Sequence, residues 1–130
     1  MSDPRHPVDP DGVDAVLQAG LPAGEAQAMA PVVNLLADPL RFRILSALLV
    51  TDELCVGDLA IALDANDDAV SYGLRLLRRA GLVQRRREGR MGYYRLGDGA
   101  ARQELVAALA HLRALAALGP HSDADRTDDL

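Results

Sequence analysis

One cysteine and one aspartate stand three residues apart in the stretch ELCVGDL, at Cys55 and Asp58. At the start of a helix this spacing places both side chains on one side. A thiolate and a carboxylate are competent ligands for zinc or a similar divalent ion. The same two residues also suit a half-buried apolar position followed by an acid in the first turn of a helix. The sequence leaves both interpretations open.

The basic residues of the chain are all arginines, and they are concentrated in one segment. Nine of the fourteen fall between Ser71 and Arg102, where the acids are Glu88 and Asp98, so nine positive charges against two negative give +7. The whole chain has a net charge of −5 because its acids gather near both ends. An arginine-rich stripe in an acidic chain is typical of a surface that binds a polyanion. A solvated charged face is the competing interpretation, and the scarcity of acids in the stripe disfavours it.

The composition sets limits on the class of protein. A length of 130 residues suits one domain with a modest core. The hydrophobic fraction of 49%, dominated by Ala and Leu and without Trp, favours helices packed through aliphatic side chains. The sequence has no apolar run of about 18 residues and no apolar leader, and one cysteine cannot form an internal disulfide. We therefore expect a cytoplasmic protein with no membrane partner.

The candidate residues must be positioned by a small set of elements. Residues 1–12 and 119–130 are polar and acidic, and we expect them to be flexible tails on either side of one folded domain over 13–118. Apolar spacing predicts helices over 13–19, 23–37, 39–49, 56–63, 67–79 and 100–118.

Several residues mark the boundaries of these elements. Pro31 warns of a kink or a break in its helix. Asp38 and Pro39 supply an N-cap and a first-position proline for the next helix, and Gly81 closes the helix over 67–79. Two short runs, 82–87 and 91–96, flank Gly89, whose backbone freedom suits a tight hairpin.

The order of helix, three-residue turn, helix and arginine-bearing hairpin is the layout of a winged helix-turn-helix, a mainly α fold with a two-stranded wing. In this fold the helix over 67–79 would lie in the major groove, and the hairpin would lie along the DNA backbone with Arg90 at its tip. Because side chains alternate along a strand, at least one arginine of the run 85–87 must point away from DNA. The residues predicted to contact DNA are Asp67, Ser71, Tyr72, Arg75, Arg78, Arg79, Arg87 and Arg90.

Four segments of the chain resemble the successive signatures of the ArsR/SmtB family of metal-sensing repressors: LADPLRFRILSALL, ELCVGDLA, AVSYGLRLLRRAGLV and REGRMGYYRLGD. The likeness runs from about Leu36 to His111. It implies a homodimeric winged-helix repressor whose metal-free form binds an operator palindrome and whose affinity falls when metal binds. It also implies dimer contacts through the first and last helices, over 13–19 and 100–118. The residues Ser71-Tyr72-Gly73 replace the usual Ser-His-Gln of the family, so we expect an unusual operator.

The resemblance implies a first metal site at Cys55 and Asp58, completed by the partner's N-terminal tail. Here that tail offers His6, with Asp3 and Asp9 as further ligands. Family members that sense large soft ions carry several thiolates, so a single cysteine argues against arsenic, cadmium and lead and leaves nickel, zinc or cobalt.

The resemblance also implies a second site on the last helix. Asp98 and His111 match one Asp and one His of the family's zinc, cobalt and nickel site, whose two other ligands fall at alanines in this chain. Water or His121 could complete the set, although two ligands bind a divalent ion weakly. A helix N-cap at Asp98 and a polar residue at a dimer seam at His111 are the favoured alternatives.

The leading prediction is a sequence-specific DNA-binding repressor that a divalent transition metal (nickel, zinc or cobalt) releases from its operator. The alternative is a metal-independent winged-helix regulator controlled by a second regulatory protein or by oxidation of Cys55. No Ser-His or Cys-His spacing and no phosphate-binding glycine loop indicates an enzyme.

Overall fold

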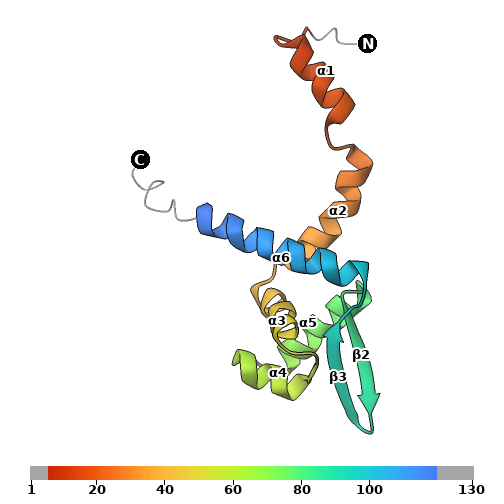
Figure 1. Cartoon of the computed structure of the whole chain (residues 1–130), viewed down its shortest axis with the longest axis vertical. Coiled ribbons are helices and arrows are strands. Elements are labelled where there is room, and N and C mark those ends of the chain that lie inside the picture. Colours follow the sequence, from red (N-terminus) through yellow and green to blue (C-terminus); the bar gives the residue numbers. More distant parts are fainter. Residues whose placement is uncertain (1–5, 120–130) are drawn as a thin grey trace. The chain divides into compact units, whose positions relative to one another are not determined.

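The computed structural model describes residues 6–119, and the chain divides into two compact units over residues 1–34 and 35–130 (Figure 1). Within the described range no helix has the length and apolar character needed to cross a membrane.

The N-terminal unit contains helix α1 (Pro10–Ala19) and most of helix α2 (Ala23–Leu36). Helix α1 begins at Pro10, so residues 10–12 are helical and do not belong to the predicted flexible tail. The reason is local: Asp9 caps the helix by accepting a 3.0 Å hydrogen bond from the Gly12 N–H, and proline suits the first helical position. Helix α2 runs through Pro31 as one helix, so of the two expected effects of this proline the break is wrong, and the kink stays a prediction.

The second unit carries seven elements, six of them in the predicted order and one a short strand that was not predicted. They are α3 (Pro39–Val50), β1 (Leu54–Cys55), α4 (Val56–Leu63), α5 (Asp67–Arg79), β2 (Val83–Glu88), β3 (Met91–Leu96) and α6 (Ala100–Leu118). Helix α3 begins as predicted, because Asp38 Oδ2 accepts a 3.0 Å hydrogen bond from the Arg41 N–H and Pro39 follows the cap.

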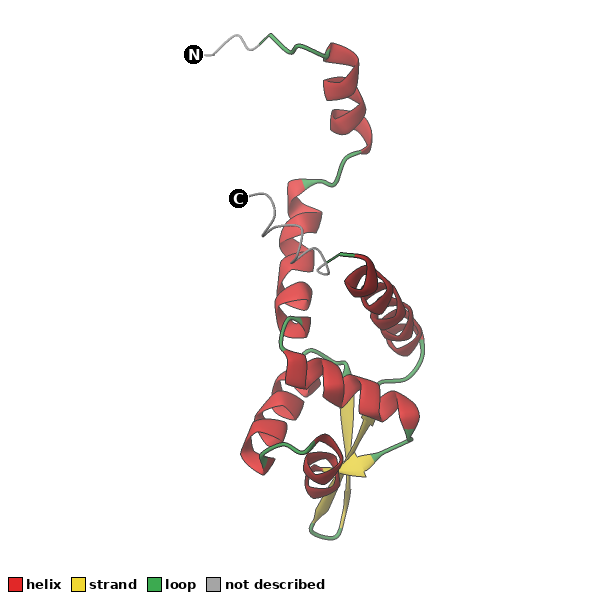
Figure 2. Cartoon of the chain, turned by 90° about the vertical axis from the view of Figure 1, so that its left-hand side faces the viewer, coloured by secondary structure: helices red, strands yellow, loops and turns green. Residues whose placement is uncertain are grey.

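The core of this unit lies among α3, α4, α5 and the base of the hairpin. Its fully buried side chains are Ile44, Leu45, Leu48, Leu59, Val70, Leu74, Leu77, Val83 and Leu96. They come mainly from the apolar faces of the three helices, so α5 is held by packing against both α3 and α4. Figure 2 shows the hairpin extending past these helices, with its loop at the far end.

The sheet has three strands in the order β1-β3-β2, and both pairs are antiparallel. The predicted hairpin is confirmed as β2–β3, and Gly89 adopts φ 61° in its turn. Strand β1 was not predicted, because two residues are too few to show an alternating pattern. The fold is therefore the predicted winged helix-turn-helix, with a third short strand at the base of the wing.

One tight joint links α5 to the wing. Gly81, at φ 81°, ends the helix in a Schellman motif, in which Gly81 N–H donates to Arg78 C=O and Leu82 N–H donates to Leu77 C=O, both at 3.0 Å. The Gly97 N–H donates to Leu82 C=O at 3.0 Å, and a Cβ on Gly97 would lie 3.2 Å from the Gly81 carbonyl oxygen. The start and the end of the wing are thus pinned together directly after α5.

Candidate nucleic-acid interface

Helices α4 and α5 and the turn between them form the helix-turn-helix. Asp64 ends α4 in the left-handed region, at φ 50°. The side chain of Asn66 caps α5 by accepting hydrogen bonds from the N–H groups of Asp68 (2.7 Å) and Ala69 (3.2 Å). The sequence pointed to a turn here but not to this cap, although asparagine before a helix is a recognised capping signal. Asp67 and Asp68 follow in the first turn, where carboxylates complement the helix dipole.

Helix α5 separates its core residues from its predicted DNA-binding residues. Val70, Gly73, Leu74 and Leu77 are buried at the spacing of one helical face. All six predicted residues on α5 are exposed on the remainder of its surface: Asp67, Ser71, Tyr72, Arg75, Arg78 and Arg79. The structure therefore brings these six side chains to one solvent-facing surface.

Gly73 accounts for the departure from the family pattern in structural terms. A Cβ at this position would lie 3.1 Å from Ile44 Cδ1 and 3.5 Å from Arg41 Cγ, both on α3. Glycine therefore permits close packing of α5 against α3. This packing offsets the cost of glycine to helix stability, which is about 1 kcal/mol relative to alanine. It faces the core of the protein.

Tyr72 and Arg75 form an exposed pair on α5. The guanidinium carbon of Arg75 lies 5.4 Å from the centroid of the Tyr72 ring, within the range of a cation–π contact. Tyr72 remains 52% exposed, so its ring is still accessible. In the described part of the chain, Arg75, Arg78 and Arg79 form no ion pair, which leaves their charges available for phosphate.

The wing separates its arginines onto two faces. Arg85 and Arg87 stand opposite Tyr94 and Gly92, whereas Arg86 stands opposite Tyr93 on the other face. This confirms that the run 85–87 cannot point one way.

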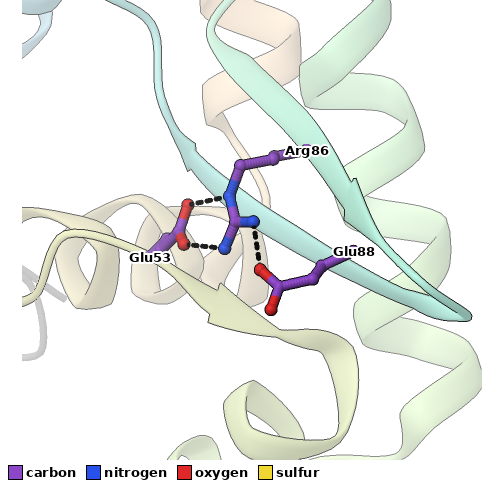
Figure 3. A network of polar contacts seen from close by, with 3 residues as sticks. All are labelled: Glu53, Arg86 and Glu88. Atoms are coloured by element: carbon purple, nitrogen blue, oxygen red, sulfur yellow. Dashed lines mark hydrogen bonds and ion pairs between the residues drawn. The ribbon is translucent and has the colours of Figure 1, made fainter.

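Arg86 is held by two carboxylates (Figure 3). Its Nε donates to Glu53 Oε2 at 3.3 Å, its Nη2 bonds the other oxygen of Glu53, and its Nη1 donates to Glu88 Oε1 at 2.6 Å. The same guanidinium lies 4.8 Å from the centroid of the Tyr93 ring. The hydrogen bond from Arg86 lowers the pKa of Glu53, and the hydrogen bonds to Glu53 and then Glu88 raise the pKa of Arg86.

The remaining wing arginines are disposed differently. Arg87 and Arg90 are exposed and form no ion pair within residues 6–119, as a DNA-contacting role requires. The side chain of Arg85 reaches over the neighbouring strand β3, since a Cβ on Gly92 would be 2.9 Å from its Nε. Arg95 pairs with Asp98, with Nη2 and Oδ1 3.1 Å apart. The segment's charge is therefore partly neutralised at Arg86 and Arg95 and is left open on α5 and at the wing tip.

The two residues of the first predicted metal-binding pair differ in their exposure to solvent. Cys55 is the last residue of β1 and the N-cap residue of α4, and it is 8% exposed. Asp58 is exposed in the first turn of α4. His6 and Asp9 are exposed residues of the N-terminal unit, and Asp3 lies outside the described residues. The ligand set of Cys55, Asp58 and His6 stays a prediction.

In the second predicted metal-binding pair, Asp98 is engaged by another residue. Asp98 accepts two hydrogen bonds or ion-pair contacts from Arg95 and does not cap α6, because Gly99 at φ 71° is the N-cap residue. The interpretation of Asp98 as a helix N-cap is therefore wrong. His111 is exposed on α6, and His121 lies outside the described residues. Among residues 6–119 of one chain, no three His, Cys, Asp or Glu side chains cluster closely enough to hold a metal ion.

Comparison with known proteins agrees with this architecture. The model of the family "Bacterial regulatory protein, arsR family" matches residues 38–85, from the start of α3 into β2. A "Transcriptional repressor SmtB homolog" from Synechocystis sp. is 51% identical over 74 residues, which cover 57% of this chain and 55% of that protein. A "Cadmium resistance transcriptional regulatory protein CadC homolog" from Staphylococcus aureus is 35% identical over 91 residues, covering 70% of this chain and 75% of that protein.

A solved structure shows the same fold. The transcriptional repressor BigR from Xylella fastidiosa superimposes with a TM-score of 0.60 at 27% sequence identity, covering 71% of this chain and 90% of that one. The fold, the exposed face of α5 and the similarity to regulators over most of their length lead to one assignment. The chain belongs to the arsR family of bacterial regulatory proteins, which are winged helix-turn-helix, DNA-binding transcriptional regulators and not enzymes.

Proposed function

We propose that the protein is a transcriptional repressor that binds a palindromic operator as a homodimer. The observation that carries this proposal is the single exposed face of α5, which presents Ser71, Tyr72 and Arg75. Beside them, at the C-terminal end of the helix, lie two arginines that form no ion pair with any described residue. The dimensions of a helix suit the major groove, where arginine recognises guanine and phosphate. Arg87 and Arg90 on the wing add sequence-independent phosphate contacts.

The homodimer is supported by apolar side chains that are exposed on the first and last helices. On α1 these are Val13, Val16 and Leu17, and on α6 they are Val106, Leu112, Leu115 and Leu118. An apolar groove between α3 and α6 is lined in part by Leu49, Val106 and Leu109. A two-fold contact through such surfaces would bury them and would place two copies of α5 on a symmetric operator.

Control by a divalent metal is the second part of the proposal. The names of the SmtB and CadC relatives support it, since one of them is a cadmium resistance regulator. In this chain the ligands would be Cys55, Asp58 and His6, or Asp98 and His111 with further groups, and a single thiol favours nickel, zinc or cobalt. A metal at Asp98 would have to displace Arg95 from its carboxylate.

A titration tests both parts. The dimeric protein is first mixed with fragments of its own upstream region over a range of salt concentrations, and we expect a salt-sensitive, saturable complex. Nickel, zinc and cobalt are then added in turn, and one of them should release the DNA.

Matched variants identify the ligands used. Cys55→Ser should abolish release if the first site operates, and His111→Ala should do so if the second operates. Gln103→Ala is the control on α6, because Gln103 is exposed and is neither a predicted metal ligand nor one of the apolar residues of the proposed dimer contact. Release by no divalent ion would instead favour control by a partner protein or by oxidation of Cys55, and absence of any DNA complex would overturn the repressor function.

A further inference from the structure

The wing loses one strand of support part of the way along its length. Strand β1 pairs with β3 at Leu54↔Tyr94 and Cys55↔Tyr93, whereas β2 and β3 continue to pair as far as Glu88↔Met91. Toward the turn of the hairpin, Tyr93 is therefore the last residue of β3 that has both β1 and β2 beside it. Beyond it the wing is a two-stranded ribbon, and such ribbons twist readily and are marginally stable alone.

Arg86 stands at this last three-stranded level. It is paired with Tyr93 on β2–β3, and Tyr93 is paired with Cys55 on β3–β1. From the edge strand β2 its guanidinium lies over the ring of Tyr93 on the central strand. It reaches Glu53, which directly precedes β1 (Figure 3). The side chain therefore connects one edge of the sheet to the other across all three strands.

We propose that Arg86 is a positioning residue for the wing, and that it fixes the direction in which Arg87 and Arg90 meet DNA by acting through Glu53. This inference rests on the proposed DNA-binding function. The bidentate geometry of an arginine–carboxylate pair gives directional control that a single contact does not. Glu88, two residues further along β2, adds a second carboxylate to the same guanidinium.

A direct phosphate contact from Arg86 is disfavoured by the same geometry. Three of its nitrogen atoms already bond carboxylates, and it lies on the opposite face of β2 from Arg85 and Arg87. Binding phosphate would leave Glu53 and Glu88 without their cation next to a polyanion.

A purely electrostatic role and a positioning role for Glu53 predict opposite changes in DNA affinity for one substitution. Removal of a carboxylate near a DNA-binding surface should tighten DNA binding on electrostatic grounds. If Glu53 holds Arg86 and thereby the wing, Glu53→Gln should weaken operator binding by about fivefold, because the wing must then be ordered during association. Asp52→Asn is the matched control: it removes an exposed acid one residue away that is not an ion-pair partner of Arg86.

The experiment compares the full-length wild type with Glu53→Gln, Arg86→Gln, the double variant and Asp52→Asn. Each single variant at the pair should lose affinity, the double variant should lose no more than either single, and Asp52→Asn should bind as tightly as the wild type or more tightly. The slope of log affinity against log salt should stay unchanged in Arg86→Gln. A slope that falls by about one indicates a direct phosphate contact and overturns the proposal, as do additive losses or tighter binding by Glu53→Gln.

A second measurement needs no DNA. Backbone ¹⁵N relaxation of the free protein should show faster motion at Gly89 and Arg90 in Glu53→Gln than in the wild type or Asp52→Asn, and equal mobility would overturn the proposal. Arg86→Lys provides a second variant if Glu53→Gln folds poorly, because lysine keeps the charge but cannot form the bidentate pair. If the wild type binds no DNA, the repressor function fails, and the relaxation data still decide whether the pair holds the wing.

Discussion

Helix α5 and the wing present arginines to the same predicted partner, but they are held in place by different forces. Helix α5 is fixed by a buried apolar face, on which Val70, Leu74 and Leu77 have no exposed surface, and by a cap at each end. The wing beyond Tyr93 has two strands, and the polar contacts of Arg86 lie on the surface at its base. The position of α5 thus depends on hydrophobic burial, whereas the direction of the wing depends on interactions that water and salt can weaken.

The comparison also shows why a count of arginines is a poor guide to DNA contacts. Arg86 and Arg95 lie within the arginine-rich segment, yet both are paired with acids. The arginines of α5 and of the wing tip are exposed without such partners in the described part of the chain. Position relative to nearby carboxylates decides which charges can reach phosphate.

The largest expected effect comes from breaking the apolar support of α5. Leu74→Ala removes a fully buried side chain and should lower the free energy of unfolding by about 3 kcal/mol. Chemical denaturation followed by circular dichroism measures this loss. Ile61→Ala on α4 is the control, because Ile61 is 80% exposed, and it should change stability little; equal losses in the two variants would contradict the assignment of the core.

The next effect concerns the wing tip. Arg90→Ala should weaken binding to all DNA sequences by about tenfold, because a charge-assisted contact to phosphate is lost. The salt slope should fall by about one. Binding to operator and random duplexes over a range of salt concentrations tests this prediction, and an unchanged slope would show that Arg90 does not touch the backbone.

A smaller effect is expected from the reading face of α5. Tyr72→Ala removes an exposed ring and releases Arg75 from its cation–π contact. The ratio of affinities between operator variants should change by about fivefold, with the salt slope preserved. Competition binding against a set of base-substituted operators measures the ratio. A uniform loss across all sequences would assign Tyr72 to positioning and not to base recognition.

The smallest effect is the pH dependence of the contact between Glu53 and Arg86. Because Arg86 lowers the pKa of Glu53 below its ordinary value of 4.5, the stabilisation is present above that value and is lost as pH falls through the lower folded-state pKa. The difference in thermal midpoint between wild type and Glu53→Gln should therefore be small near neutral pH and vanish in strong acid. A difference that grows on acidification would contradict this linkage.

The sequence predicted the elements whose signals are local. Asp38-Pro39 began a helix and Gly81 ended one where expected, and the two short runs that flank Gly89 indicated the hairpin. The exposed face of α5 followed from helical periodicity, and all six of its predicted DNA-binding residues are on it.

Features that depend on distant residues could not be read in this way. The contact between Arg86 and Glu53 joins positions 33 residues apart, and the packing role of Gly73 requires Ile44 on another helix. Strand β1 exists only through its pairing with Tyr93 and Tyr94. The pairing of Asp98 was missed for a different, local reason: nothing in the cap pattern distinguishes a capping acid from one that pairs with Arg95, three residues earlier.

The Schellman turn at Gly81 has a mechanical consequence. Three backbone segments meet there within hydrogen-bonding distance: the end of α5, the first residue before β2, and Gly97 on the way to α6. If α5 tilted in the groove, the base of the wing would move with it, because these hydrogen bonds join the two elements and no flexible linker lies between them. In a dimer joined along α6, the fit of each α5 to its half of an operator would therefore also change the position of the adjacent wing.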